Sequence, residues 1–178
     1  SQSAGAVSQD LDGSWTCQPA GTGPFPAILY NHGGLGMKVG GDLEGTCRAL
    51  ADQGYLARSE QRPLTESPSL EGHLDDVLSG LDTLLSHPQA DTSRVAIMGF
   101  SRGGLLSLQA GVTRPTQIHA IVLMAPAAGK NSLEQTLKEA SKVAAPVRIY
   151  VSENDLYQDD HVKLANDVLA ALEAEEKD

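Results

Sequence analysis

The chain has 178 residues, of which 40% are hydrophobic and 20% charged, so we expect one packed domain over residues 1–178. Its 23 acidic residues outnumber the 13 lysines and arginines and give a net charge of −10, which argues against a nucleic-acid partner and against an anionic membrane surface. The apolar runs are far shorter than the roughly 20 residues that span a bilayer.

Short apolar runs alternate along the chain with longer stretches of helical spacing. In chain order the pattern predicts a strand at 25–30, a helix at 42–53, a strand at 55–58, a helix from 67–68 to 85, a strand at 95–100, a helix at 102–113, a strand at 118–125, a helix at 132–143, a strand at 147–151 and a helix at 160–175. Strands that are apolar on both faces and alternate with helices indicate an α/β fold, a mostly parallel twisted sheet with helices on both faces. Such sheets bind ligands where their strands end.

Two cysteines, Cys17 and Cys47, are too few for a disulfide scaffold, and no CxxC pair suggests a metal site. They form either one bridge or two free buried thiols, and the sequence leaves both open. The small polar residues 1–6 are typical either of a mature end left after removal of an export signal or of an artificial extension. Both a cytoplasmic and an exported location therefore remain open.

The motif Gly99-Phe100-Ser101-Arg102-Gly103-Gly104 stands between a predicted buried strand and a predicted helix. A GxSxG sequence in this setting is typical of a nucleophile elbow, in which glycines permit a sharp turn and the serine hydroxyl stands clear of the sheet. The amide of Arg102, at a helix N-terminus, is then placed to donate to an oxyanion. We therefore predict that Ser101 is a nucleophile; the alternative is an ordinary glycine-rich turn.

A second motif, His32-Gly33-Gly34, follows the first predicted strand. Its glycines let the backbone approach a substrate carbonyl, so Gly34 is predicted to supply the second oxyanion amide. We expect His32 itself to orient or pack this turn rather than to act as a base.

A carboxylate, Asp155, comes just beyond the strand at 147–151, and a serine nucleophile needs a base together with an acid that orients it. Asp155 is the predicted acid, ahead of Glu153, which lies nearer the strand. The alternative is that Asp155 caps the helix that begins near Asp160. His161 is the histidine nearest to Asp155 in sequence, so we take it as the candidate base and the other four histidines as structural.

Taken in order, these motifs resemble the α/β-hydrolase superfamily, and within it the dienelactone hydrolase-like branch, from about Trp15 to the C-terminus. The resemblance implies hydrolysis of esters, lactones or related acyl bonds, with no metal and no organic cofactor. Dienelactone hydrolases proper use a cysteine nucleophile, whereas this chain has Ser101, which favours a carboxylesterase-like activity. The resemblance also implies a further strand and a histidine loop after the last helix, so we expect the sequence to be part of a longer protein.

Three functions therefore follow from the sequence. The first is a serine hydrolase that cleaves a small carboxylic ester or lactone through an acyl-enzyme. The second is a non-catalytic relative that binds a ligand or a partner through the same cleft. The third, within hydrolases, is a peptidase-like or thioesterase activity, which the GxSxG motif also allows. Arg58 and Arg62, near a strand end, either contact a carboxylate of the substrate or form salt bridges. The substrate and the oligomeric state are open.

Overall fold

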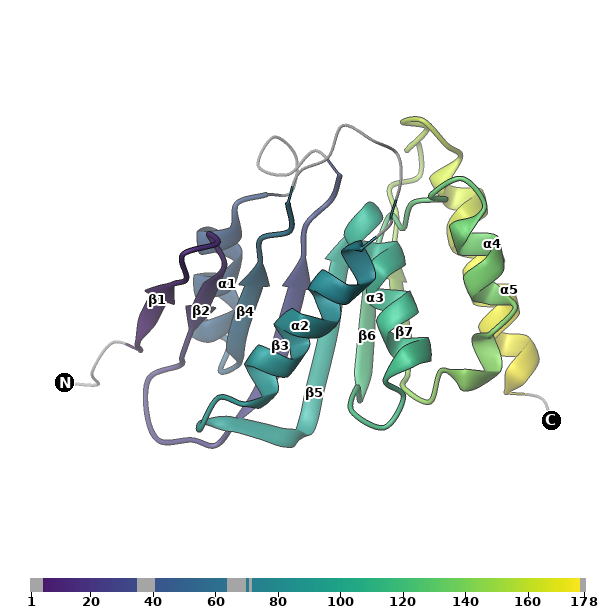
Figure 1. The fold of residues 1–178 in the computed structure, drawn as a ribbon. Coiled ribbons are helices and arrows are strands. Elements are labelled where there is room, and N and C mark those ends of the chain that lie inside the picture. Colours follow the sequence, from purple (N-terminus) through teal and green to yellow (C-terminus); the bar gives the residue numbers. More distant parts are fainter. Residues whose placement is uncertain (1–4, 35–40, 64–69, 71, 177–178) are drawn as a thin grey trace.

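A seven-stranded mixed sheet forms the centre of the molecule (Figure 1). The computed structural model describes residues 5–34, 41–63, 70 and 72–176. The strands are β1 (Val7–Gln9), β2 (Trp15–Cys17), β3 (Phe25–Asn31), β4 (Leu56–Glu60), β5 (Ala90–Phe100), β6 (Ala120–Met124) and β7 (Val147–Tyr150), in the order β1-β2-β4-β3-β5-β6-β7. Strands β4, β3, β5, β6 and β7 are parallel to one another. Strands β1 and β2 pair antiparallel at the β4 edge of the sheet.

Helices cover both faces of this sheet (Figure 1). They are α1 (Leu43–Asp52), α2 (His73–Leu85), α3 (Arg102–Thr113), α4 (Ser132–Leu137), the 3₁₀-helix η2 (Ala140–Lys142) and α5 (His161–Glu175). Helices α2 and α3 lie on one face and α1 on the other. Asp42 caps α1 by accepting from the Gly45 amide, and Gly54 adopts a φ of +95° just after its end.

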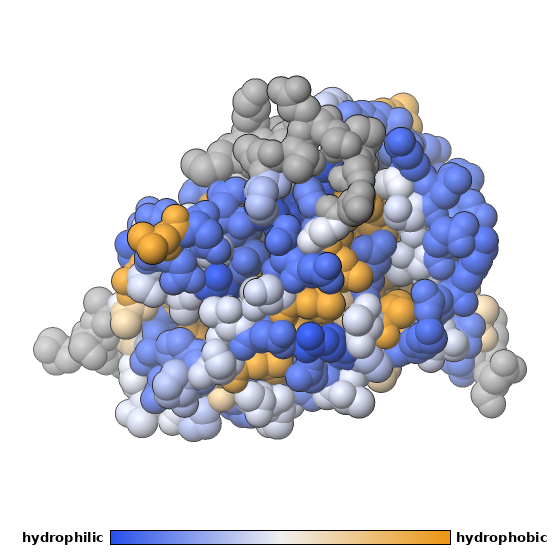
Figure 2. Space-filling model, viewed as in Figure 1, coloured by the Kyte–Doolittle hydropathy of each residue, from blue (hydrophilic) through white to orange (hydrophobic). Residues whose placement is uncertain are grey.

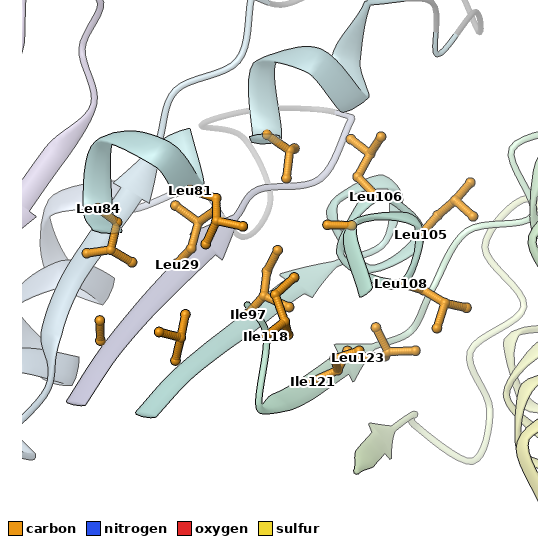
Figure 3. Close-up of a cluster of buried hydrophobic side chains, with 14 of the residues drawn as sticks. Leu29, Leu81, Leu84, Ile97, Leu105, Leu106, Leu108, Ile118, Ile121 and Leu123 are labelled. Carbon is orange, nitrogen blue, oxygen red and sulfur yellow. The ribbon is translucent and has the colours of Figure 1, made fainter. Parts of the chain in front are cut away.

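The larger core fills the space between the sheet and the helices α2 and α3 (Figure 3). Leu29 and Ile97 of neighbouring strands meet Leu81 of α2 and Leu106 of α3 there, all with no exposed surface. The view in Figure 2 shows a mostly hydrophilic outer surface on this side, with hydrophobic residues in the gaps between polar ones. A second core joins α1 to the opposite face and contains the buried Cys17–Cys47 disulfide.

The alternation of strands and helices predicted from the sequence is confirmed, with changes at element ends. The chain from residue 90 to 94 belongs to β5, and the helix predicted at 132–143 is instead the short α4 followed by η2. Within the described ranges α2 begins at His73, while the expected cap at 67–68 lies outside them. The sequence did not predict β1 or β2, whose three residues each are too few for a periodic pattern.

Candidate active site

The end of β5 and the start of α3 form a sharp turn with Ser101 at its apex. Ser101 has φ 53° and ψ −115°, a left-handed conformation that a residue with a side chain rarely adopts. Its main chain is held by three hydrogen bonds: its amide donates to the Met124 carbonyl at 2.9 Å, and its carbonyl accepts from Leu105 at 3.1 Å and from Ala127 at 3.0 Å. Strained backbone held this firmly is typical of functional sites.

The glycines of the motif are required by close backbone contacts. A Cβ at Gly99 would overlap the Gly103 carbonyl, and a Cβ at Gly103 would overlap the Asn31 and His32 carbonyl oxygens. A Cβ at Gly104 would lie 3.1 Å from the Gly99 carbonyl oxygen. The turn at Ser101 therefore packs directly on the turn that follows β3, as a nucleophile elbow requires.

The turn at Gly33 and Gly34 lies against the side chains of Phe100 and Arg102. A Cβ at Gly34 would lie 3.1 Å from Cζ of Arg102, and a Cβ at Gly33 would lie 3.1 Å from the Phe100 ring. Among the residues that the structure describes, neither the Gly34 nor the Arg102 amide has a hydrogen-bond acceptor. An oxyanion hole requires amides that are free to donate, so the role of Gly34 and Arg102 stays a prediction.

Asp155 and His161 lie together beyond β7. His161 Nε2 is 3.9 Å from Asp155 Oδ1, and the His161 amide donates to the Asp155 carbonyl at 3.2 Å. The cap of α5 is Asp160, which accepts from the Lys163 amide at 3.0 Å, so the alternative role of Asp155 as the helix cap is wrong. The Asp155 carboxylate instead accepts from the Tyr157 amide at 3.3 Å and is partly exposed.

The structure does not bring His161 into contact with Ser101. Its Nε2 donates to the Tyr157 carbonyl at 2.8 Å, which fixes the proton on that nitrogen because a carbonyl can only accept. Its buried Nδ1 has no partner, and Ser101 Oγ has no hydrogen bond to any described residue. A base at His161 would therefore require the imidazole to leave the Tyr157 carbonyl.

Three other histidines use their rings to bind the backbone. His32 is buried and donates from Nδ1 to the Gly33 carbonyl at 2.6 Å, while Nε2 accepts from the Arg62 amide at 3.0 Å. Burial, and next the positive charge of Arg62, lower the pKa of His32 to about 4. His87 and His119 accept backbone amides at Nδ1. The predicted orienting role of His32 agrees with these contacts.

His73 is a residue of this edge that the sequence did not single out. It is the first residue of α2, a helix whose N-terminus faces the same sheet edge as Ser101 because α2 follows a parallel strand. His73 is buried, its Nδ1 has no hydrogen-bond partner among the described residues, and burial followed by the charges of Arg62 and Arg102 lowers its pKa. Its helical position was visible in the sequence, but its neighbours were not.

The two arginines near the end of β4 have different environments. Arg58 lies inside the strand and pairs with Asp10 and Glu60, each at 2.7 Å, so the salt-bridge interpretation holds for it. Arg62, two residues past the strand, is 1% exposed and donates from Nη2 to the His32 carbonyl at 2.5 Å. Burial, and next the charge of Arg102, lower its pKa to about 10.

Other features of the described part of the chain do not lead to a different site. A groove of about 760 Å³ between α2, α3 and α4 has Gly129 and Ser132 in its lining but not Ser101. Within the described ranges, no three histidine, cysteine, aspartate or glutamate side chains gather in a way that would hold a metal ion. None of the described helices has the length and apolar character needed to cross a membrane.

Comparison with known proteins gives the family. The family model described as serine aminopeptidase, S33, matches residues 27–176. Mouse acyl-coenzyme A thioesterase 3 is 37% identical over 93 residues, which are 49% of this chain and 20% of that protein. An uncharacterised peptidase of Bacillus subtilis, YtmA, is 27% identical over 110 residues, 59% of this chain and 42% of that protein. The chain thus spans less than half the length of either relative.

Solved structures share the fold at low sequence identity. A putative dienelactone hydrolase from Klebsiella pneumoniae superposes with a TM-score of 0.74 at 20% identity, over 98% of this chain and 82% of that one. Esterase Est22 gives 0.72 at 18% identity, over 96% and 70%. The Pyrococcus horikoshii acylaminoacyl peptidase gives 0.70 at 21% identity, over 97% and 35%.

Proposed function

Because the chain belongs to the serine aminopeptidase S33 family of α/β-hydrolases, we propose that it is a serine hydrolase that cleaves a small carboxylic ester or lactone through an acyl-enzyme. The observation that carries the proposal is the strained turn at Ser101, together with the amides of Gly34 and Arg102, which have no acceptor among the described residues. A hydroxyl held in this way can attack a carbonyl carbon, and the amides of Gly34 and Arg102 can stabilise the resulting oxyanion.

The proposed reaction has two halves. Ser101 Oγ bonds to the acyl carbon while a base takes its proton, and the tetrahedral intermediate then expels the alcohol, which receives that proton. Water, deprotonated by the same base, attacks the acyl-serine and releases the carboxylic acid together with free Ser101. No redox step and no cofactor enter this scheme.

We assign the base to His161 and its orienting acid to Asp155. The support is their proximity, 3.9 Å between His161 Nε2 and Asp155 Oδ1, at the edge where β7 ends. The assignment requires the imidazole to release the Tyr157 carbonyl and turn toward Ser101. In the part of the chain that the structure describes, His73 also has a buried ring nitrogen without a hydrogen-bond partner, so the two histidines are tested side by side.

The test of the nucleophile is covalent labelling with a fluorophosphonate. We expect one phosphonyl group on Ser101 of the wild type and none on Ser101→Ala, with Ser86→Ala, an exposed serine at the end of α2, labelled like the wild type. A folded wild-type protein that takes up no label, or takes it up on another residue, would contradict the proposal.

The test of the base compares His161→Gln with His73→Gln. Loss of the base lowers the rate of Ser101 phosphonylation and ester hydrolysis by about 10³-fold or more. We expect this loss in His161→Gln and a change of less than about tenfold in His73→Gln. The reverse order would move the role of base to His73.

A second function, binding without catalysis, is favoured by one observation: Ser101 Oγ has no hydrogen bond to a histidine within the described ranges. Under that function, Ser101→Ala would keep the ligand affinity and no ester, thioester or amide would be hydrolysed. A panel of p-nitrophenyl esters, a lactone, an acyl thioester and a peptide amide separates the two functions and also defines the acyl bond that is cleaved.

A further inference from the structure

Two turns at the ends of neighbouring parallel strands hold each other through crossed hydrogen bonds. His32 follows β3, and Arg62 follows β4 by two residues. The Arg62 amide donates to Nε2 of the His32 ring at 3.0 Å, and Arg62 Nη2 donates to the His32 carbonyl at 2.5 Å. Each side chain thus binds the main chain of the other residue. We call this pair of bonds the His32–Arg62 clamp.

The clamp works only with a neutral imidazole. Nδ1 of His32 carries the proton that it donates to the Gly33 carbonyl, so Nε2 is free to accept. The titratable or charged groups that act on this ring are Arg62 beyond β4 and His73 on α2, and both disfavour a second proton on it. The ring is 2% exposed, which shields the bond from water.

Burial and the charge of Arg102 disfavour the cation at Arg62, and interactions with Asp76, Glu60 and Tyr30 offset this only in part, because the pKa of Arg62 is still lowered. The Arg62 side chain is 1% exposed, and its Nε and Nη1 have no partner among the described residues. Burying a cation with unpaired donors is costly, and an apolar side chain of similar volume is often as stable or more stable in such a place. We therefore look for a functional role in the hydrogen bond that the Arg62 side chain donates to the His32 carbonyl.

The His32 carbonyl lies at the contact between the two turns of the active site. A Cβ at Gly103 would overlap it, so the carbonyl lies against the first turn of α3 on one side and bonds to Arg62. Two residues on, Gly34 lies against the guanidinium group of Arg102, which follows Ser101 in the chain. A shift of this carbonyl would therefore move the Gly34 amide relative to Ser101.

We propose that the His32–Arg62 clamp fixes the Gly34 amide in the oxyanion hole, which makes Arg62 a positioning residue for acyl transfer. The inference rests on the proposed serine hydrolase function and extends it to a residue outside the predicted catalytic set. A misplaced donor weakens binding of the transition state while binding of the ground-state substrate changes little.

The experiment compares Arg62→Met with the matched control Arg114→Met. Arg114 directly follows the last residue of α3, and its side chain forms an ion pair with Asp82 of α2. The readouts are kcat and KM for a p-nitrophenyl ester, the inhibition constant of phenylboronic acid, and amide hydrogen exchange of residues 32–34. One oxyanion donor is worth about 10²–10³-fold in kcat. We expect Arg62→Met to lose about 10–100-fold in kcat with KM within about threefold.

The other readouts should change in parallel. The boronic acid, which forms a tetrahedral adduct on a serine, should bind Arg62→Met more weakly by about the same factor as the loss in kcat. Exchange of the Gly34 amide should be faster in Arg62→Met. Arg62→Lys, which keeps one donor for the His32 carbonyl, should recover part of both losses, and Arg114→Met should match the wild type.

A folded Arg62→Met with wild-type kcat, boronic acid affinity and Gly34 exchange would overturn the inference. Failure of the proposed hydrolase function would look different, because the wild type itself would then neither hydrolyse the ester nor bind the boronic acid. In that case the exchange rate of the Gly34 amide would still show whether the His32–Arg62 clamp holds this amide in place. If Arg62→Met does not fold, nitrogen NMR of the wild type decides: the clamp requires a protonated Nδ1 and an unprotonated Nε2 on His32 at pH 6, and any other state overturns it.

Discussion

Ser101 and Gly103 show how single residues build the candidate site. Ser101 occupies a left-handed conformation, which costs a non-glycine residue about 1–3 kcal/mol, and three main-chain hydrogen bonds keep it there. Gly103 allows α3 to approach the backbone after β3 so closely that no side chain fits between them. Both features place Ser101 at a strained turn that packs closely on the turn after β3.

Gly103→Ala should therefore be damaging, since its methyl group would overlap the backbone oxygens of Asn31 and His32, which cannot move freely. We expect a loss of about 2–3 kcal/mol in the free energy of unfolding, measured by urea denaturation, and a large loss of phosphonate labelling. Gly111→Ala on the same helix meets only the flexible end of Ile121 and gains helix propensity, so it should change stability by less than about 1 kcal/mol. Equal effects of the two substitutions would refute this account.

His32 makes a second residue-scale prediction, on pH. Its pKa is about 4 in the folded protein and about 6.5 in the unfolded chain, so between these values the unfolded chain binds a proton that the folded protein does not. The contribution of His32 to stability is therefore complete above about pH 6.5, falls as the pH is lowered, and is lost below about pH 4. The loss should reach about 3 kcal/mol.

The measurement is the free energy of unfolding from pH 7 to pH 4 for the wild type and for His32→Gln. The difference in stability between the two proteins should shrink as the pH falls. A constant difference across this range would show that the His32 ring is not held in its neutral form.

At the scale of elements, the disulfide joins the N-terminal strand pair to the rest of the fold. Cys17 ends β2 and Cys47 lies in α1, and their Cα atoms are 5.7 Å apart with both residues fully buried. The bridge closes a segment of 30 residues that includes β3. Of the two alternatives that the sequence left open, the bridge is the one the structure contains.

Replacing both cysteines, Cys17→Ala with Cys47→Ala, should lower the free energy of unfolding by about 3–4 kcal/mol, because the unfolded chain regains the entropy of the open loop. Urea denaturation of the oxidised wild type and of the double variant measures this loss. Reductant should destabilise the wild type and leave the double variant unchanged. A double variant as stable as the oxidised wild type would contradict a stabilising role for the bridge.

The elements also show what the sequence could predict. β3 and the second half of β5 were predicted because continuous apolar runs identify buried parallel strands. The strands β1 and β2 were not, since their pairing with β4 and the disulfide, rather than any local pattern, hold them in the sheet. The helix predicted at 132–143 divides after Leu137, a boundary that the capping pattern at its start does not determine.

The same limit applies to the site. Glycine spacing, which reflects local backbone sterics, predicts roles for Ser101, Gly34 and Arg102. The structure places the turn at Ser101 against the turn after β3, and the roles stay predictions. The His32–Arg62 clamp and the burial of His73 depend on which strands are neighbours and how their ends align, and no local pattern encodes that register.

At the scale of the whole molecule, the chain is an acidic α/β-hydrolase with a mixed seven-stranded sheet. The groups proposed for the reaction come from turns after β3, β5 and β7, which share one edge of the parallel part of the sheet. Far apart in the sequence, they lie at one edge of the sheet because parallel strands end on the same side. The curated relatives include a thioesterase and a peptidase, and the chain spans less than half the length of each, so the substrate panel must identify the acyl bond that this protein cleaves.

The central claim, that Ser101 carries the acyl group during turnover, is tested most directly by trapping that intermediate. The protein is mixed with p-nitrophenyl acetate, quenched in acid within the first turnovers, and examined by intact-mass and peptide mass spectrometry. We predict one acetyl group, located on Ser101, appearing with the burst of nitrophenol and absent from Ser101→Ala. Hydrolysis without an acyl group on Ser101, or neither hydrolysis nor acylation in the folded wild type, would contradict the account.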